Sequence, residues 1–449
     1  MGYGDVPPRA QRLLDEMADG LDRGLVPLTI YSDPEIYRLE LERIFTRCWV
    51  FLGHETEIPN PGDYVHRYVG EDPWILVRDD ADQVRVLFDS CRHRGTQVCR
   101  ADMGNTSHFR CPYHGWTYNN SGALVGIPNR KEAYGGLDPH EWGLLQAAQV
   151  DTYRGLVFAC LDDATPPLNE YLGDFRWYLD QHLALTPGGM EVIGEPHRWK
   201  LDADWKSGAE NFSGDSYHTQ FLHRSILAIG LGVNAPPEQM AERASPHQHV
   251  TEVSGHATSV RRSAPGKPGF WGYPPEVVAG IDGAQLSPEQ LELARTTINT
   301  TGNVFPNLSF IHASPTDDPA KPPATYLSLR QWQPRGPGRM EAWSWVLAPT
   351  EASAAYKARA YKVAVATFAP GGNFEQDDTI VWGSIARNAR SVFAAKAGAR
   401  LNYQMGLEGM SDARPIPDWP GPGVVYDSNL EEGVQRTFLR HWLREMSRP

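Results

Sequence analysis

Two cysteine–histidine pairs, separated by 17 residues, constrain this chain more than any other feature. Cys91 and His93 form a Cys-x-His pair, and Cys111 and His114 form a Cys-x-x-His pair. Two thiolates and two imidazoles are suited to zinc or to an iron–sulfur cluster. The segment 91–114 therefore predicts a metal centre.

The residues that flank these pairs separate the two kinds of metal centre. Spacing alone leaves a structural zinc site open. The stretches Cys-Arg-His-Arg-Gly at 91–95 and Cys-Pro-Tyr-His-Gly-Trp at 111–116 resemble the two cluster-binding loops of Rieske proteins, in which two histidines replace two cysteines on one iron. Gly95 and Gly115 suit tight loops whose amides approach the cluster sulfurs. We therefore expect a Rieske [2Fe-2S] cluster.

Composition excludes several classes of protein. A length of 449 residues favours two domains. The net charge of −13 argues against broad binding to nucleic acid or to an anionic membrane. The sequence has no apolar run long enough to span a membrane and no apolar signal core, so we expect a cytoplasmic protein. The five cysteines are a poor disulfide framework, and we expect apolar buried thiols at Cys48, Cys99 and Cys160.

The pattern of apolar, polar and turn-forming residues changes along the chain. Residues 8–24 and 34–46 have helical patterns. From Trp49 to about Leu161, short alternating stretches separated by Gly, Asn and Asp predict a small all-β module. Residues 162–169 are rich in Asp and Pro and predict a linker.

The remainder mixes helices and strands. Residues 205–230 have helical patterns in parts, and 235–290 are rich in Pro, Gly and His and predict long loops. Apolar segments at 303–313, 325–333 and 340–348 predict antiparallel strands. Helical patterns follow at 351–368 and 431–446. The prediction is an α+β fold in which helices cover a long antiparallel sheet.

A second group of metal-ligand residues lies beyond the β module. His218 and His223 are five residues apart, so on a regular helix they would be separated by about 140°. They can bind one metal only if the helix bulges or ends between them. Alone, such histidines are more often structural. The acidic pair Asp377 and Asp378 follows Gly371-Gly372, and two histidines with one carboxylate form the facial triad of non-haem iron oxygenases.

These motifs together resemble one family over nearly the whole chain. They are the two Rieske loops, Asn-Phe-x-Gly-Asp-x-Tyr-His-x4-His at 211–223, Val-Phe-Pro-Asn at 304–307 and Phe-Glu-Gln-Asp-Asp at 374–378. The chain is similar to the α subunits of Rieske non-haem iron dioxygenases that hydroxylate aromatic rings, of the naphthalene and biphenyl type. The resemblance implies three segments: N-terminal helices over 1–47 that pack on the catalytic domain, a Rieske domain over 48–165 and a catalytic domain over 166–449.

The resemblance also implies roles for individual residues. Cys91 and Cys111 would hold one iron of the cluster, and His93 and His114 the other. His218, His223 and Asp378 would bind the mononuclear Fe(II). Asp215 matches a carboxylate that bridges a Rieske histidine of the neighbouring subunit to an iron-ligand histidine. The substrate pocket would be lined by Asn211, Phe212, Ser216, Thr219, Asn299, Thr301 and Phe374 and by the segment near 256–264.

The implied partners follow from what the chain lacks. No nicotinamide or flavin fingerprint and no plant-type ferredoxin pattern occurs in the sequence. The resemblance therefore implies a ferredoxin and a reductase that deliver electrons from NAD(P)H. It also implies a small β subunit, commonly in an α3β3 assembly. The expected product is a cis-dihydrodiol.

The substrate is the least determined property. Relatives that oxidise hydrocarbons keep the segment near 256–264 apolar, whereas this chain has Arg261 and Arg262 there. By the resemblance, Arg261 falls where a pocket-lining aliphatic side chain would sit, so we expect it to bind substrate. A buried guanidinium beside a hydrocarbon is costly, but it anchors a carboxylate. We therefore expect an aromatic carboxylate such as phthalate, and the family member is then a phthalate 3,4-dioxygenase. The alternatives are a polycyclic or alkyl aromatic hydrocarbon, a monooxygenation or demethylation at the same metals, and an electron-transfer Rieske protein.

Overall fold

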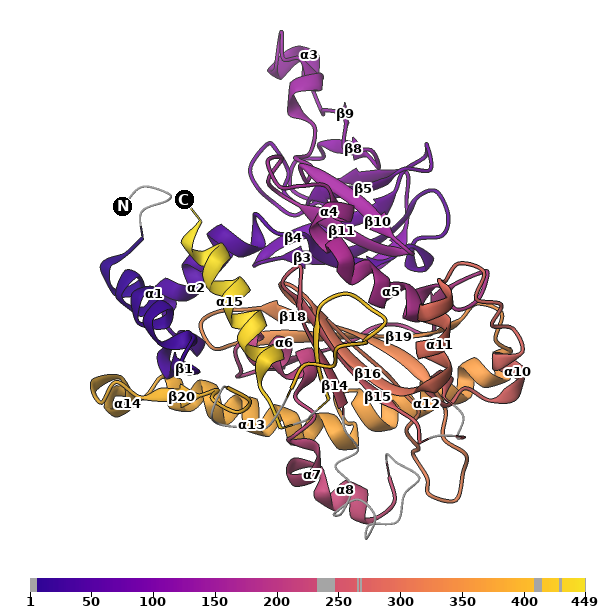
Figure 1. The fold of residues 1–449 in the computed structure, drawn as a ribbon. Helices are drawn as coiled ribbons and strands as arrows, with labels where there is room; N and C mark the ends of the chain where they lie inside the picture. The colour runs from indigo at the N-terminus through magenta and orange to yellow at the C-terminus, as the bar shows by residue number, and fades with distance from the viewer. Residues whose placement is uncertain are drawn as a thin grey trace. The chain divides into compact units, whose positions relative to one another are not determined.

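The computed structural model describes residues 6–231, 247–264, 266, 269–407, 414–427 and 430–448. The chain divides into two units (Figure 1). The smaller unit spans Phe45–Leu168, and the larger combines Met1–Ile44 with Asn169–Pro449. The predicted α+β class is confirmed.

The smaller unit consists of three antiparallel sheets, as the alternating stretches predicted. Its first sheet has the order β10-β11-β2, its second β5-β4-β3-β6 and its third β7-β8-β9. The strands are β2 Val50–His54, β3 Asp63–Val69, β4 Asp72–Arg78, β5 Val84–Phe88, β6 Met103–Asn105, β7 His108–Arg110, β8 Thr117–Asn119, β9 Leu124–Gly126, β10 Gln149–Tyr153 and β11 Leu156–Cys160. Short helical turns are η3 Glu55–Glu57, α3 Arg130–Ala133 and η4 Pro139–Trp142.

A nine-stranded antiparallel sheet organises the larger unit (Figure 1). The strand order is β12-β19-β18-β17-β16-β15-β14-β21, and β13 also pairs with β19. The strands are β12 Met190–Val192, β13 His197–Leu201, β14 His247–Val253, β15 His256–Arg262, β16 Thr297–Val304, β17 Leu308–Ala313, β18 Tyr326–Pro334, β19 Met340–Pro349 and β21 Val424–Asp427. A separate pair joins β1 Leu25–Pro27 to β20 Arg400–Asn402.

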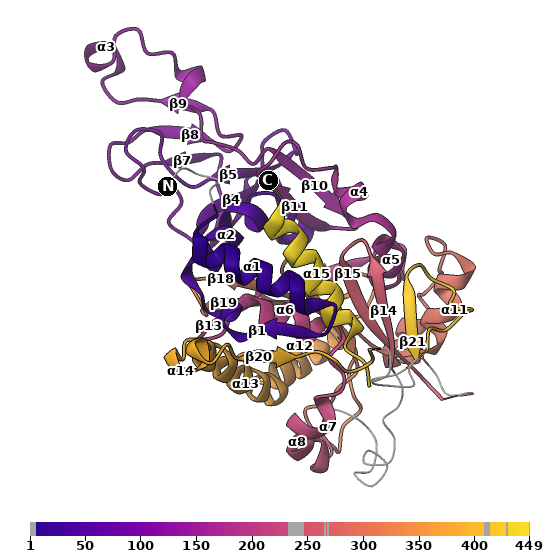
Figure 2. The same cartoon turned by 60° about the vertical axis from the view of Figure 1, so that its left-hand side comes forward.

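Helices pack against this sheet. The described helices are α1 Pro8–Leu21, η1 Leu28–Tyr31, α2 Pro34–Glu40, η2 Leu41–Phe45, α4 Leu168–Leu172, η5 Gly173–Phe175, α5 Arg176–Leu183, α6 Trp205–Gly214, α7 Thr219–Leu222, α8 Arg224–Ala228, η6 Phe270–Gly272, α10 Pro275–Val278, α11 Pro288–Thr296, α12 Ala354–Phe368, α13 Asn373–Ala389, α14 Val392–Lys396 and α15 Gly433–Ser447. Figure 2 shows α15 beside α1 and α6, both of which it contacts.

Helix α6 packs on the sheet, and its C-terminal end leads into the site. Its N-cap Asp204 accepts the backbone N–H of Lys206, and its Gly208 lies so close to the Trp332 ring that a Cβ would sit 2.5 Å away. Because the helix is almost wholly buried against β15 to β18, its C-terminal end is fixed over the sheet.

One sequence expectation was wrong in the larger unit. Of the segment 235–290 predicted as loops, residues 247–253 and 256–262 form the adjacent strands β14 and β15, while 235–246, 265, 267 and 268 lie outside the described residues. These strands carry His, Gln, Thr, Ser and Arg, so they lack the apolar alternation that marks a strand. The acidic pair 377–378, for which no secondary structure was predicted, lies within the 17-residue helix α13.

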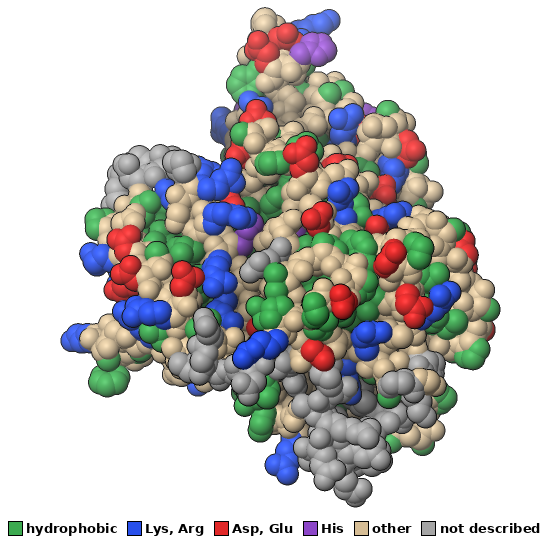
Figure 3. Space-filling model, viewed as in Figure 1, with side chains coloured by type: hydrophobic (Ala, Val, Ile, Leu, Met, Phe, Trp, Pro, Cys, Tyr) green, Lys and Arg blue, Asp and Glu red, His purple; other side chains and the backbone are tan. Residues whose placement is uncertain are grey.

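The surface mixes both signs of charge. Figure 3 shows acidic and basic side chains interspersed over the face drawn. Among the described residues, no helix combines the length and apolar character needed to cross a membrane.

Candidate functional site

A break between two helices brings His218 and His223 together. Helix α6 ends at Gly214, and α7 is a single turn over Thr219–Leu222. His218 precedes this turn and His223 follows it, so neither is held at the angle of a continuous helix. Their ring centroids lie 5.2 Å apart. The structure therefore has the helix ending that the five-residue spacing required.

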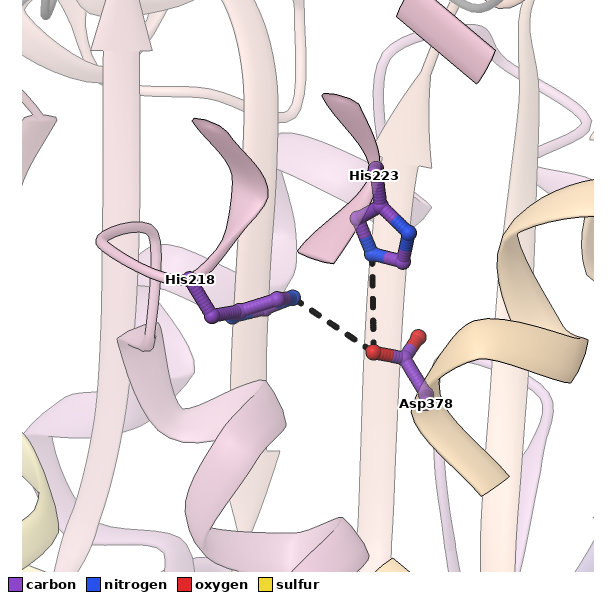
Figure 4. A group of neighbouring side chains, drawn as sticks. All are labelled: His218, His223 and Asp378. Atoms are coloured by element: carbon purple, nitrogen blue, oxygen red, sulfur yellow. Dashed lines mark ion pairs between the residues drawn. The ribbon is translucent and has the colours of Figure 1, made fainter. Parts of the chain in front are cut away.

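Asp378 completes a three-residue group with these histidines (Figure 4). Its Oδ1 lies 3.5 Å from Nε2 of His218 and 3.5 Å from Nε2 of His223, and the three ligand atoms lie within 4.8 Å of one another. The side chains of Asp378 and His223 are 5% and 4% exposed. Asp378 Oδ1 is buried and has no hydrogen-bond partner. A carboxylate oxygen left unpaired between two imidazole nitrogens fits a metal ion.

A second layer of polar groups fixes both imidazole rings. His223 Nδ1 lies 3.2 Å from Asp377 Oδ2, and His218 Nδ1 lies 3.4 Å from Asp215 Oδ2 and 3.4 Å from Asn211 Nδ2. A carboxylate that accepts from Nδ1 leaves Nε2 free as a ligand atom and orients the ring toward the metal. Sequence reasoning missed this place for Asp377, although its position next to Asp378 was the available signal.

The electrostatics of the ligand group are strongly coupled. Burial opposes the charge on His218, but its hydrogen bond to Asp215 and the charges of Asp215 and Asp378 outweigh this and raise its pKa to about 9. Burial also opposes the charge on Asp215, yet the hydrogen bond and charge of His218 hold the pKa of that carboxyl below its usual range. The site is therefore poised to hold positive charge.

A cavity of about 150 Å³ lies beside the ligand group. It resembles in volume the apolar cavities of about 150 Å³ that accommodate benzene. Every predicted substrate-binding residue lines it: Asn211, Phe212, Ser216, Thr219, Arg261, Asn299, Thr301 and Phe374. Sequence reasoning missed the further lining residues Leu227, His247, Ile311, Ala313, Pro315 and Phe368.

Strand register makes the wall of this cavity polar on one side and apolar on the other. Arg261 on β15 is paired with His247 on β14 and with Asn299 on β16. The next row on the same face pairs His249, Ser259, Thr301 and Ile311 in order across four strands. Since alternate residues of a strand share a face, three neighbouring strands present a polar patch, and β17 adds Ile311 and Ala313.

Arg261 is the most unusual residue of the polar wall. It is half-buried, and burial lowers the pKa of its guanidinium. Its Nε is buried without a hydrogen-bond partner. Arg262 is exposed and donates from Nε to Thr296 Oγ1 instead. Of the two arginines, the register therefore places Arg261 at the cavity.

The Rieske motif forms two matching loops in the smaller unit. The backbone N–H groups of Gly95 and Gly115 donate to the carbonyls of Cys91 and Cys111, and both glycines have positive φ, +75° and +73°. The rings of His93 and His114 lie 4.5 Å apart, and the Nδ1 atom of each is buried and unpaired. Two buried thiols and two orphaned imidazole nitrogens fit an iron–sulfur cluster.

Comparison with known protein families supports both the cluster site and the three-residue ligand group. Residues 48–153 match the Rieske [2Fe-2S] domain, and residues 176–448 match the ring hydroxylating α subunit, catalytic domain. The chain therefore contains a Rieske domain and a catalytic domain that implies a mononuclear iron. The alternative of an electron carrier without oxygenase activity is not supported.

Three relatives cover almost the whole chain. The N,N-dimethyl phenylurea N-demethylase subunit α of a Sphingobium species is 38% identical over 97% of this chain and 94% of its own length. The biphenyl dioxygenase subunit α of Paraburkholderia xenovorans is 37% identical over 99% and 94%. The crystal structure of naphthalene 1,2-dioxygenase from a Rhodococcus species, bound to indole, has a TM-score of 0.92 and 42% identity, with coverage of 99% and 100%. This chain belongs to the family of Rieske aromatic-ring-hydroxylating dioxygenase α subunits, of the naphthalene and biphenyl dioxygenase type.

Proposed function

We propose that this chain adds both atoms of dioxygen to adjacent carbons of a neutral aromatic compound with one or two rings, and so forms a cis-dihydrodiol. The observation that carries the proposal is the juxtaposition of His218, His223 and Asp378 with a cavity that has an apolar wall. A ring packed on that wall would present its carbons to the ligand group.

The metal centres would be held by the residues already described. His218, His223 and Asp378 would hold an iron(II), which supplies open coordination positions for dioxygen beside the substrate. The cluster would be held by Cys91, His93, Cys111 and His114.

The chain's own side chains would position the reactants. Asp377 and Asp215 hold the two imidazoles in the tautomer that frees Nε2. Phe212 and Phe374, both buried, would hold the flat substrate ring and exclude water from it. Positioning of this kind supplies much of the rate enhancement in an enzyme.

The named relatives support a neutral substrate. Those described above are named for biphenyl, naphthalene and a phenylurea, and another, from Pseudomonas putida, is named for benzene. None of these is an aromatic carboxylate. The preference for phthalate that the sequence suggested has no support among them. We replace it with a neutral aromatic ring, a class that includes the alternative of a polycyclic or alkyl aromatic hydrocarbon.

One observation favours a second candidate, an aromatic carboxylate. Arg261 lines the cavity with an unpaired buried Nε. A carboxylate substituent would satisfy this guanidinium in a bidentate pair. The two candidates therefore differ in what they require of Arg261.

The electron supply and the assembly are further parts of the proposal. Asp215 would carry the electron path from the Rieske histidine of a neighbouring α chain to His218, which requires a ring of α subunits. We propose an α3β3 assembly with a small β subunit. A ferredoxin and an NAD(P)H-dependent reductase would supply the electrons.

A single-turnover experiment with ¹⁸O₂ tests the reaction and the substrate together. The iron-loaded enzyme is reduced chemically and exposed to ¹⁸O₂ with naphthalene or with phthalate. The proposal expects a naphthalene dihydrodiol with two labelled oxygen atoms, and no dependence of this product on Arg261→Leu. Arg262→Leu is the matched control, because that side chain faces away from the cavity.

Other outcomes reassign the function. A phthalate dihydrodiol that Arg261→Leu abolishes would establish the carboxylate candidate. Products with a single labelled oxygen would assign a monooxygenase instead of a dioxygenase.

A further inference from the structure

A hydrogen-bonded series of three side chains ends at the wall of the cavity. His249 Nδ1 lies 2.9 Å from Glu431 Oε1, and His249 Nε2 lies 3.2 Å from Ser216 Oγ. Ser216 lines the cavity, whereas His249 and Glu431 are only 1% and 3% exposed. The series therefore reaches from a buried carboxylate to a hydroxyl that the substrate can touch.

The geometry determines which way the hydrogen atoms point. The other oxygen of Glu431, Oε2, accepts the backbone N–H of Gly433 and lies 3.8 Å from the Arg436 guanidinium. A carboxylate in these surroundings accepts hydrogen bonds, so the hydrogen of His249 resides on Nδ1. The lone pair on Nε2 then accepts the Ser216 O–H. Only the lone pairs of the Ser216 oxygen remain for the cavity.

The same polar wall offers a donor as well as this acceptor. A guanidinium can only donate hydrogen bonds, and Arg261 has a buried Nε that is unpaired. Arg261 lies two residues from Ser259 on the same face of β15, and Ser259 is paired with His249, the partner of Ser216. The wall thus combines a donor, Arg261, with an acceptor, Ser216, that His249 holds in place.

We propose that the substrate carries a neutral secondary-amide substituent, of the anilide or aryl-urea class, whose carbonyl accepts from Arg261 and whose N–H donates to Ser216. This inference rests on the proposed function, because it names the substituent of the ring that is oxidised. A plain hydrocarbon would leave the Arg261 Nε without a partner and would make no hydrogen bond to Ser216. A carboxylate would satisfy Arg261 but set its charge against the lone pairs of Ser216.

Equilibrium binding to the oxidised, iron-loaded full chain tests the donor requirement. Acetanilide is compared with phenylacetone, which keeps the carbonyl and replaces the N–H by CH2, and both are titrated calorimetrically. We expect acetanilide to bind about fivefold more tightly, the worth of one neutral hydrogen bond. Ser216→Ala should remove this preference and Ser216→Thr should keep it. Equal binding of the two ligands to the wild type would overturn the proposal.

The Glu431→Gln variant tests whether Glu431 sets the position of the His249 ring hydrogen. A purely structural role of Glu431 would not change which ligand the cavity prefers. The Gln carbonyl should take the position that accepts from Gly433, so its NH2 group faces His249 Nδ1 and moves the ring hydrogen to Nε2. Ser216 then accepts from His249 and presents its own O–H to the cavity. The acetanilide preference should disappear and benzoate binding should strengthen. An unchanged preference in Glu431→Gln would contradict the proposed hydrogen arrangement.

The proposed function and the inference about the substituent can be refuted separately. If naphthalene gives a dihydrodiol but the acetanilide preference is absent, the substituent inference fails and the proposed function stands. If no aromatic compound yields a doubly labelled product, the proposed function itself fails.

Discussion

Glu210 offers the sharpest test of the electrostatics beneath the site. Its carboxyl group is buried on α6 and accepts from Tyr31 Oη at 2.8 Å and from Tyr403 Oη at 3.0 Å. Burial, with a smaller contribution from the charge of Asp215, raises the pKa of Glu210 to about 8, although both tyrosine hydroxyls act in the opposite direction. We therefore predict that Glu210 is a neutral acid at pH 6.5.

The raised pKa has a defined effect on stability. A rise from 4.5 to about 8 means that the folded state keeps this proton where the unfolded state has lost it. The contribution to the free energy of unfolding is full below pH 4.5 and is lost as the pH rises to about 8. Within that window the slope is about −1.4 kcal/mol per pH unit, and the total is on the order of 5 kcal/mol. Glu210→Gln has no such proton and lacks this slope.

Two measurements check the prediction. The infrared difference spectrum between wild type and Glu210→Gln at pH 6.5 should contain the carbonyl band of a protonated carboxylic acid. Chemical denaturation at pH 5.5, 6.5 and 7.5 should show the wild type losing about 1.4 kcal/mol per unit relative to the variant. Glu292→Gln, at a side chain that is 68% exposed, is the control and should change neither result. Parallel pH profiles together with no carbonyl band would refute the reasoning.

Three further predictions concern the metals and the core. Asp378→Ala should lower iron content from three to two atoms per chain while the visible spectrum of the cluster persists, and loss of both signals would show general misfolding. Cys111→Ser should abolish the cluster spectrum and leave one iron atom bound at His218, His223 and Asp378. Gly208→Ala should lower stability by about 1–3 kcal/mol in thermal denaturation, because its Cβ would lie 2.5 Å from the fully buried Trp332. Gly383→Ala is its control in another helix, since the nearest atom there is 3.6 Å away, and it should stabilise by up to about 1 kcal/mol.

The cluster loops could be predicted from sequence because their geometry is local. The spacing of Cys91 and His93, and of Cys111 and His114, fits within single loops, and the glycines that follow have the positive φ that such loops need. The histidine pair required a helix that bulges or ends between the two residues, and α7 ends at Leu222, directly before His223. Local chemistry was sufficient in both cases.

The elements that could not be predicted depend on contacts between distant segments. Strands β14 and β15 carry few apolar residues, since one face lines a polar cavity, so hydrophobic alternation did not reveal them. Helix α13 begins just after Gly371-Gly372, and no helix was predicted there from the sequence. Asp377 contacts His223, which lies 154 residues earlier in the chain. No local pattern reports such a contact.

The substrate is hardest to predict because it depends on strand register. Val260, Arg261 and Arg262 are consecutive, and a shift of one residue would exchange the face of every side chain on β15. The observed pairing sets Arg261 opposite Asn299 and a bulge follows it before Arg262, so Arg261 faces the cavity, Val260 is buried on the other face and Arg262 is exposed. The resemblance to the family placed Arg261 at the pocket, but only the strand register decides which of the two arginines faces the cavity. Because pairing with β14 and β16 makes that choice, specificity in this chain is a property of the sheet as much as of the residues on it.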